Sequence, residues 1–270
     1  MKAKIWFFIF CSIIALYQAR VLYGNENEGD VFVKAWEYYN QDKMEKAFKI
    51  VNKFNKPDSQ LRDGWVVLLG SIYLKQNRYR DALNEISKVR IRLERAYAII
   101  ENPAGQTKEA IELANSIKEQ TIFLYYRMLV VTALANFRLD NCREATHDFE
   151  VMYAMGEKGI STERKNVIFD YFLAICYYKL KDYAKATNYF TSFYETRTDS
   201  EERDSTAFNV GALNALQGKY EEAIRWLIIP LEHDRKLWLD RMKADKDFDG
   251  IRGDKKFKDF LVEQERMLTK

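Results

Sequence analysis

Apolar residues recur at spacings of three and four positions along most of the chain, which is the period of an amphipathic α-helix. Only three prolines and eleven glycines interrupt the 270 residues, too few for many short strands joined by tight turns. The pattern therefore predicts an all-α protein.

The helical pattern also repeats. Its clearest copies are WVVLLGSIYLKQNRYRDALNEISKV from Trp65, DYFLAICYYKLKDYAKATNYFTSFY from Asp170 and AFNVGALNALQGKYEEAIRWLIIPL from Ala207. Each has a large apolar residue followed by a small one, then a polar turn with a tyrosine, and an alanine three residues after the tyrosine. With three weaker copies, the marker alanines are spaced 35, 28, 35, 41 and 37 residues apart: Ala47, Ala82, Ala110, Ala145, Ala186 and Ala223.

This order of small, aromatic and alanine positions resembles the tetratricopeptide repeat (TPR) family, over about residues 28–232. The resemblance implies a right-handed α-solenoid of about six helix pairs within residues 25–240, in which small residues let the two helices of a pair approach closely. The Ala110 copy is short and contains Pro103, so a shortened helix or a change of direction is expected there. An unrelated helical bundle is the alternative.

Residues 241–270 resemble the segment that closes such solenoids, with apolar residues to cover the last repeat: Phe248, Ile251, Phe257 and Phe260. A calcium loop is the competing interpretation, because Asp245, Asp247, Asp249 and Gly250 match its first half. Lys256, however, stands where a bidentate glutamate should close the metal's shell. The sequence therefore favours a cap whose aspartates start helices.

Residues 1–24 read as an export signal: Lys2 and Lys4 precede an apolar run from Ile5 to Tyr17 that is shorter than a membrane span. The body is then expected to be periplasmic or secreted, and an uncleaved N-terminal anchor would be its one link to a membrane. Cys142 and Cys176 are expected to be buried thiols, with a disulfide between them as the alternative.

The resemblance also places partner binding in a concave groove lined by the first helix of each pair. On the helix from Asp170, one apolar stripe holds Leu173, Ala174 and Tyr177, and a second stripe lies nearly opposite. With its equivalents elsewhere, the second stripe gives these candidate groove residues: Trp36, Tyr39, Phe137, Tyr171, Ile175, Tyr178, Phe208 and Asn209. These residues are mostly apolar or aromatic, with Asn209 as the main polar exception, which favours aromatic anchoring of a helix or extended peptide over a carboxylate clamp. Internal packing of these aromatics is the alternative.

Composition narrows the function further. Acidic and basic residues number 40 and 43 and are mixed along the chain, which argues against nucleic-acid binding. With two histidines, His147 and His233, and no phosphate loop or metal-ligand motif, we predict neither catalysis nor a cofactor. The sequence favours an exported scaffold or adaptor that binds another protein. An assembly factor of the cell envelope or outer membrane and a ligand-binding or enzymatic module are the alternatives.

Overall fold

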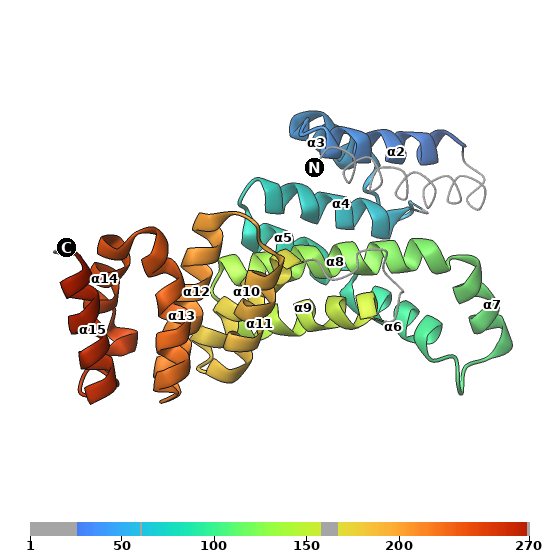
Figure 1. Cartoon of the computed structure of the whole chain (residues 1–270). Helices are drawn as coiled ribbons and strands as arrows, with labels where there is room; N and C mark the ends of the chain where they lie inside the picture. Colours follow the sequence, from blue (N-terminus) through green and yellow to red (C-terminus); the bar gives the residue numbers. More distant parts are fainter. Residues whose placement is uncertain (1–25, 60, 158–166, 269–270) are drawn as a thin grey trace. The chain divides into compact units, whose positions relative to one another are not determined.

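The computed structural model describes residues 26–59, 61–157 and 167–268, and these residues form α-helices, one 3-10 helix and loops, without a strand (Figure 1). The prediction of an all-α protein is confirmed. The chain divides into two compact units, Met1–Arg164 and Lys165–Lys270. None of the described helices combines the length and the hydrophobicity needed to cross a bilayer. The predicted export signal lies outside the described residues.

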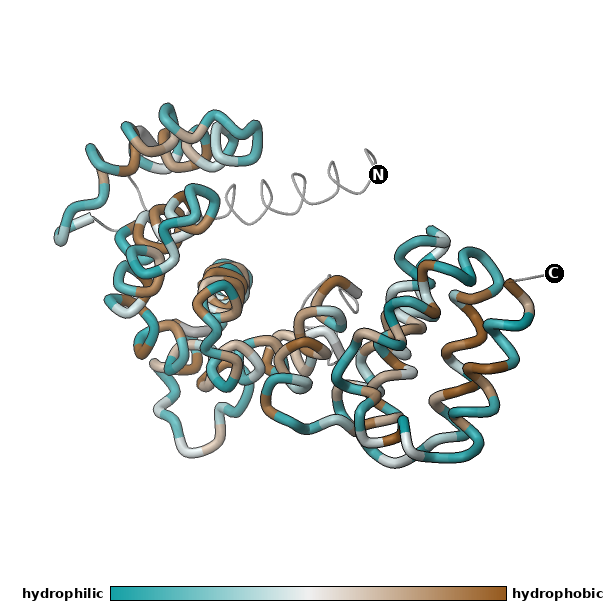
Figure 2. The backbone as a smooth tube through the Cα atoms, turned by 90° about the vertical axis from the view of Figure 1, so that its left-hand side faces the viewer, coloured by the Kyte–Doolittle hydropathy of each residue, from teal (hydrophilic) through white to brown (hydrophobic). Residues whose placement is uncertain are grey.

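In the described part of the first unit, the consecutive helices with the most extensive contacts form three pairs: α2 (Glu26–Asn40) with α3 (Met44–Phe54), α4 (Arg62–Lys75) with α5 (Tyr79–Ser87), and α8 (Lys118–Arg138) with α9 (Cys142–Glu157). Between the second and third pairs, α6 (Arg90–Glu101) packs on α8, and the short α7 (Lys108–Ser116) follows it. Hydrophobic and hydrophilic segments alternate along these helices (Figure 2).

The second unit contains two such pairs and a closing segment. The pairs are α10 (Val167–Lys179) with α11 (Tyr183–Thr196) and α12 (Ser200–Leu216) with α13 (Tyr220–His233). The closing segment comprises α14 (Arg235–Ala244), the 3-10 helix η1 (Lys246–Phe248) and α15 (Lys255–Leu268).

One turn geometry recurs inside each of the five pairs. A residue with positive φ follows the first helix, and the next residue's N–H donates to the carbonyl five positions earlier, over 2.8 to 2.9 Å. This bonding satisfies carbonyl groups that a helix end otherwise leaves without partners. The five residues with positive φ are Asp42, Asn77, Asp140, Lys181 and Gly218.

Five residues after each of these turns stands a fully buried alanine: Ala47, Ala82, Ala145, Ala186 and Ala223. The sixth marker alanine, Ala110, is only partly buried. Gly105, five residues before it, also has positive φ, but the N–H of Gln106 donates to the carbonyl of Pro103, three positions earlier, so this turn is of another kind. Ala110 lies on α7, whose first turn is capped by the Thr107 hydroxyl. Around Ala110 the chain therefore departs from the repeat in both length and packing, in agreement with the shortened copy and with Pro103.

The small residues of the repeat allow close helix contact, as predicted. A Cβ atom added to Gly70 would lie 2.8 Å from Cδ1 of Ile86, and one added to Gly211 would lie 2.7 Å from Cγ of Leu227. Both partner side chains are fully buried on the second helix of the same pair. Ala174 is likewise fully buried on α10.

The C-terminal segment packs against the α12–α13 pair through the apolar residues that the sequence assigned to a cap. Phe248, Ile251, Phe257 and Phe260 are buried in one cluster with Leu227. The ring of Phe248 stacks on that of Phe257, with centroids 5.8 Å apart. Asp245 starts η1, because its carboxylate accepts the N–H of Asp247, as the helix-starter interpretation predicts.

Candidate functional site

The eight predicted groove residues are divided between the two units. Trp36, Tyr39 and Phe137 belong to the first unit, and the other five belong to the second unit: Tyr171, Ile175, Tyr178, Phe208 and Asn209. Each unit is therefore considered by itself.

In the first unit, Trp36 and Tyr39 are buried on α2, which is the internal packing that the sequence left open. The Trp36 ring meets Tyr39 edge-on at 5.4 Å and Phe123 of α8 at 5.6 Å. Arg127 of α8 lies over both predicted residues: its guanidinium is 5.2 Å from the Trp36 ring and 5.6 Å from the Tyr39 ring. Such cation–π contacts stabilise a cation that is partly removed from water.

Arg127 is also bonded by Nη2 to the Tyr39 hydroxyl, over 3.2 Å. Within the described residues, its buried Nε and the Nε1 of Trp36 have no hydrogen-bond partner. The sequence did not point to Arg127, since it lies 88 positions from Tyr39 along the chain. The contact between α2 and α8 is therefore aromatic and cationic, rather than apolar alone.

Phe208, Asn209 and Phe137 also differ in exposure. Phe208 is buried and contacts the closing segment, with its ring centroid 5.3 Å from that of Trp238 and 5.5 Å from that of Phe248. Asn209 and Phe137 are partly exposed. Phe208 therefore helps to hold the closing segment on α12.

The two stripes of α10 have different environments. Leu173, Ala174 and Tyr177 are buried, whereas Tyr171 and Tyr178 are 37% and 39% exposed. Ile175 is partly exposed, and Ile168, one turn before Tyr171, is 48% exposed. At positions i, i+3, i+7 and i+10, the four residues Ile168, Tyr171, Ile175 and Tyr178 share one side of the helix, and we call them the α10 stripe. The sequence analysis missed Ile168, although its spacing from Tyr171 could have identified it.

Neighbouring elements hold the two tyrosines of this stripe. Tyr171 packs edge-on against Phe190 of α11 at 5.9 Å, and its hydroxyl-bearing ring remains partly in solvent. The Tyr178 hydroxyl donates to Oδ1 of Asp247 in η1 over 3.1 Å. Burial and this carboxylate raise the pKa of Tyr178 to about 12. Burial also raises the pKa of Asp247 above its usual range. The closing segment thus fixes one end of the stripe.

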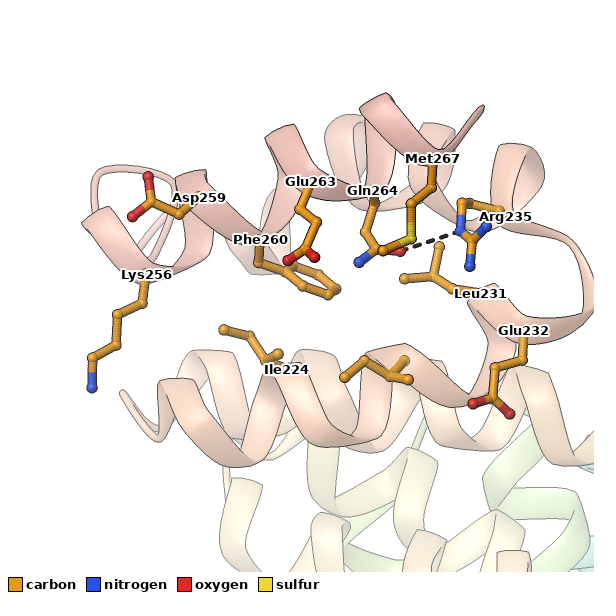
Figure 3. Close-up of a pocket in the computed structure, with 11 residues that line it drawn as sticks. Ile224, Leu231, Glu232, Arg235, Lys256, Asp259, Phe260, Glu263, Gln264 and Met267 are labelled. Atoms are coloured by element: carbon orange, nitrogen blue, oxygen red, sulfur yellow. Dashed lines mark hydrogen bonds between the residues drawn. The ribbon is translucent and has the colours of Figure 1, made fainter. Parts of the chain in front are cut away.

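A separate groove lies between α13 and α15, with a volume of about 610 Å³. Ile224 and Leu231 of α13 and Phe260 of α15 point into the space between the two helices (Figure 3). Arg235 donates through Nε to Oε1 of Gln264 at one end, over 3.2 Å. The groove is thus an apolar trough with polar ends.

Neither histidine belongs to the α10 stripe or to the groove between α13 and α15. His147 is exposed on α9. His233 lies with Nδ1 2.8 Å from the carboxylate of buried Asp204, a partner that the sequence did not indicate.

Another buried carboxylate, that of Asp148, accepts two hydrogen bonds from Arg90 and one from the Thr132 hydroxyl. This ion pair joins α6 to the α8–α9 pair. Cys142 and Cys176 are buried thiols, as predicted.

No model of a known protein family matches this chain, and no curated protein matches its sequence. Function therefore has to be argued from the chain's own repeats and surfaces. Among the described residues, apolar side chains from regular helices reach solvent together in the α10 stripe and in the groove between α13 and α15.

Proposed function

We propose that the chain is an exported scaffold of the tetratricopeptide type, a right-handed solenoid of helix pairs that binds another protein. The recurring turn with positive φ, followed five residues later by a buried alanine, supports the repeat assignment. The positive start and apolar run of residues 1–24 support export. The handedness rests on the resemblance to the family.

The observation that carries the binding proposal is the α10 stripe. A helix that buries one apolar face and exposes a second one offers that second face to a partner. Tyrosine is favoured at such surfaces because it has a large apolar body, few rotatable bonds and a polar tip. In this mechanism, Tyr171 and Tyr178 anchor an apolar segment of the partner, and Ile168 and Ile175 complete the surface.

The test is a capture experiment in which a photo-crosslinking residue replaces Ile175 in the full chain. Crosslinked partners are identified from the envelope and secreted fractions of the source cells. The same capture is repeated with Tyr171→Ala and Tyr178→Ala combined, after circular dichroism shows that the helix content is unchanged. We expect one dominant crosslinked partner, reduced about tenfold or more by the double substitution, because central aromatic anchors contribute about 2 kcal/mol or more each.

A matched control combines Ile91→Ala with Leu113→Ala, which removes two exposed apolar side chains in the first unit. The control should leave the capture unchanged. A partner that survives loss of both tyrosines, or that is lost equally in the control, would show that the α10 stripe is not the binding surface.

A further inference from the structure

The groove between α13 and α15 is long enough to receive a helix. From α15 it is lined by residues that recur every three or four positions and so share one face: Lys256, Asp259, Phe260, Glu263, Gln264 and Met267. From Lys256 to Met267 this face extends over about 16 Å, at 1.5 Å per residue. On the other side it is lined by α13 from Ile224 to Glu232, a length of about 12 Å, and by Arg235 at the start of α14. The trough therefore matches about three turns of a third helix.

The trough is open along its length rather than closed around a cavity. Ile228 and Met267, one from each wall, are 41% and 40% exposed. A small ligand bound with specificity usually has most of its surface enclosed by protein. An amphipathic helix needs to bury only its apolar face, so it suits an open trough between two helices.

The charges around the trough determine which helix fits. Three carboxylates line it, Glu232, Asp259 and Glu263, and none of them forms an ion pair within the described residues. Of the two cations that line it, Lys256 is paired with Glu221 at 2.5 Å, whereas Arg235 donates to the neutral amide oxygen of Gln264 and keeps its charge. Three unpaired carboxylates against this one cation leave the groove with a net negative charge, although the whole chain has a formal net charge of +3.

From this arrangement we propose that the α13–α15 groove is a docking site for a basic amphipathic helix of a partner protein. Apolar side chains of that helix cover Ile228, Leu231, Phe260 and Met267, and its flanking Lys or Arg side chains pair with Glu232, Asp259 and Glu263. Complementary charge of this kind gives specificity and speeds association. The site is separate from the α10 stripe and does not depend on the function proposed for that stripe.

The test uses the full chain and a labelled helical peptide of about four turns, with leucines on one face and lysines on both flanks. A twin peptide has glutamate in place of every lysine. Fluorescence anisotropy measures both dissociation constants. We expect the lysine peptide to bind about tenfold more tightly than its twin at low salt, and this preference to shrink as salt is added. Since the whole chain is positive, non-specific attraction would favour the glutamate twin instead.

Two pairs of variants locate the binding. Glu232→Lys combined with Glu263→Lys should weaken the lysine peptide about tenfold and reverse the preference between the peptides. Its control, Glu45→Lys with Glu144→Lys, makes the same change in net charge on exposed residues of the first unit and should have no effect. Ile228→Asp should abolish binding, whereas Val262→Asp, on an exposed position of α15 outside the groove, should not.

Equal affinity for both peptides would overturn the proposal, and so would equal loss in the two charge-reversal variants. If sedimentation shows that the chain forms a dimer that Ile228→Asp dissociates, a second copy of the chain occupies the groove and the proposal is wrong. Combined Tyr171→Ala and Tyr178→Ala should leave peptide binding unchanged, so that failure here and failure of the α10 stripe are distinguishable.

Discussion

The close approach of α12 and α13 at Gly211 gives a stringent test of the repeat packing. An alanine Cβ at this position would lie 2.7 Å from both Cγ and Cδ2 of Leu227 and 3.3 Å from the carbonyl oxygen of Ala223. Leu227 is fully buried, so its branch point has little room to move. Overpacking of this kind costs about 1–3 kcal/mol. The better helix propensity of alanine returns about 1 kcal/mol, so Gly211→Ala should lower the free energy of unfolding by about 1 kcal/mol.

The decisive measurement is the same substitution in a Leu227→Ala background. That background alone should cost about 2–5 kcal/mol, because it leaves a cavity. It also removes Cγ and Cδ2 of Leu227, the two atoms with which the new Cβ collides, and leaves the 3.3 Å contact with the carbonyl oxygen of Ala223. Gly211→Ala should then become stabilising by about 1 kcal/mol, from helix propensity alone. The sign of its effect therefore reverses between the two backgrounds.

Urea unfolding followed by far-UV circular dichroism measures all four proteins of this cycle. Gly253→Ala is the control for the general effect of a glycine substitution, since a Cβ there would meet nothing within 4 Å. If Gly211→Ala stabilises the wild type, or costs the same in both backgrounds, then glycine at this position does not serve close packing and the reasoning fails.

Three further predictions concern a turn, an ion pair and a carboxylate. Lys181→Gly should raise the free energy of unfolding by about 1 kcal/mol in a urea titration, because glycine adopts positive φ without strain. Arg90→Ala should cost about 3 kcal/mol in the same assay, since it leaves Asp148 buried and charged, whereas Arg92→Ala, at an exposed pair, should cost less than about 1 kcal/mol. Asp247→Asn should raise the melting temperature at neutral pH, because the raised pKa of Asp247 in the folded chain means that its ionised form opposes folding. The gain in melting temperature should vanish below a pH of about 4, where the carboxyl group is protonated in both the folded and the unfolded chain.

The features that the sequence predicted well are those set by neighbours within one helix pair. Gly70 and Gly211 could be assigned to close packing because their partners, Ile86 and Leu227, follow at a constant distance along the chain. The two stripes of α10 follow directly from helical periodicity. The recurring turn was harder to identify, since Lys181 is not a residue that positive φ favours, and only its place between two helices marks it.

The features that the sequence missed depend on segments far apart in the chain. Arg127 reaches Tyr39 from a helix that belongs to another pair, and no local pattern links them. Asp204 and His233 belong to one helix pair, but they lie 29 positions apart and no repeat position marks them. The groove itself likewise has no local signal. Each wall of the groove looks like an ordinary amphipathic helix when it is considered alone. Its character arises only when α13 and α15 are placed side by side.

This groove also bears on what the closing segment does. In a helical repeat, the last pair would expose its apolar face to water unless a terminal element with a polar outer face covered it. The closing segment meets that need at Phe248, Phe257 and Phe260, which are buried. A cap serving stability alone would also cover Ile228, yet Ile228 and Met267 stay exposed between carboxylates that have no ion-pair partner in the described structure. Apolar side chains left exposed in this way lower the solubility of the chain without adding to its stability. For this reason we expect a partner to cover Ile228 and Met267.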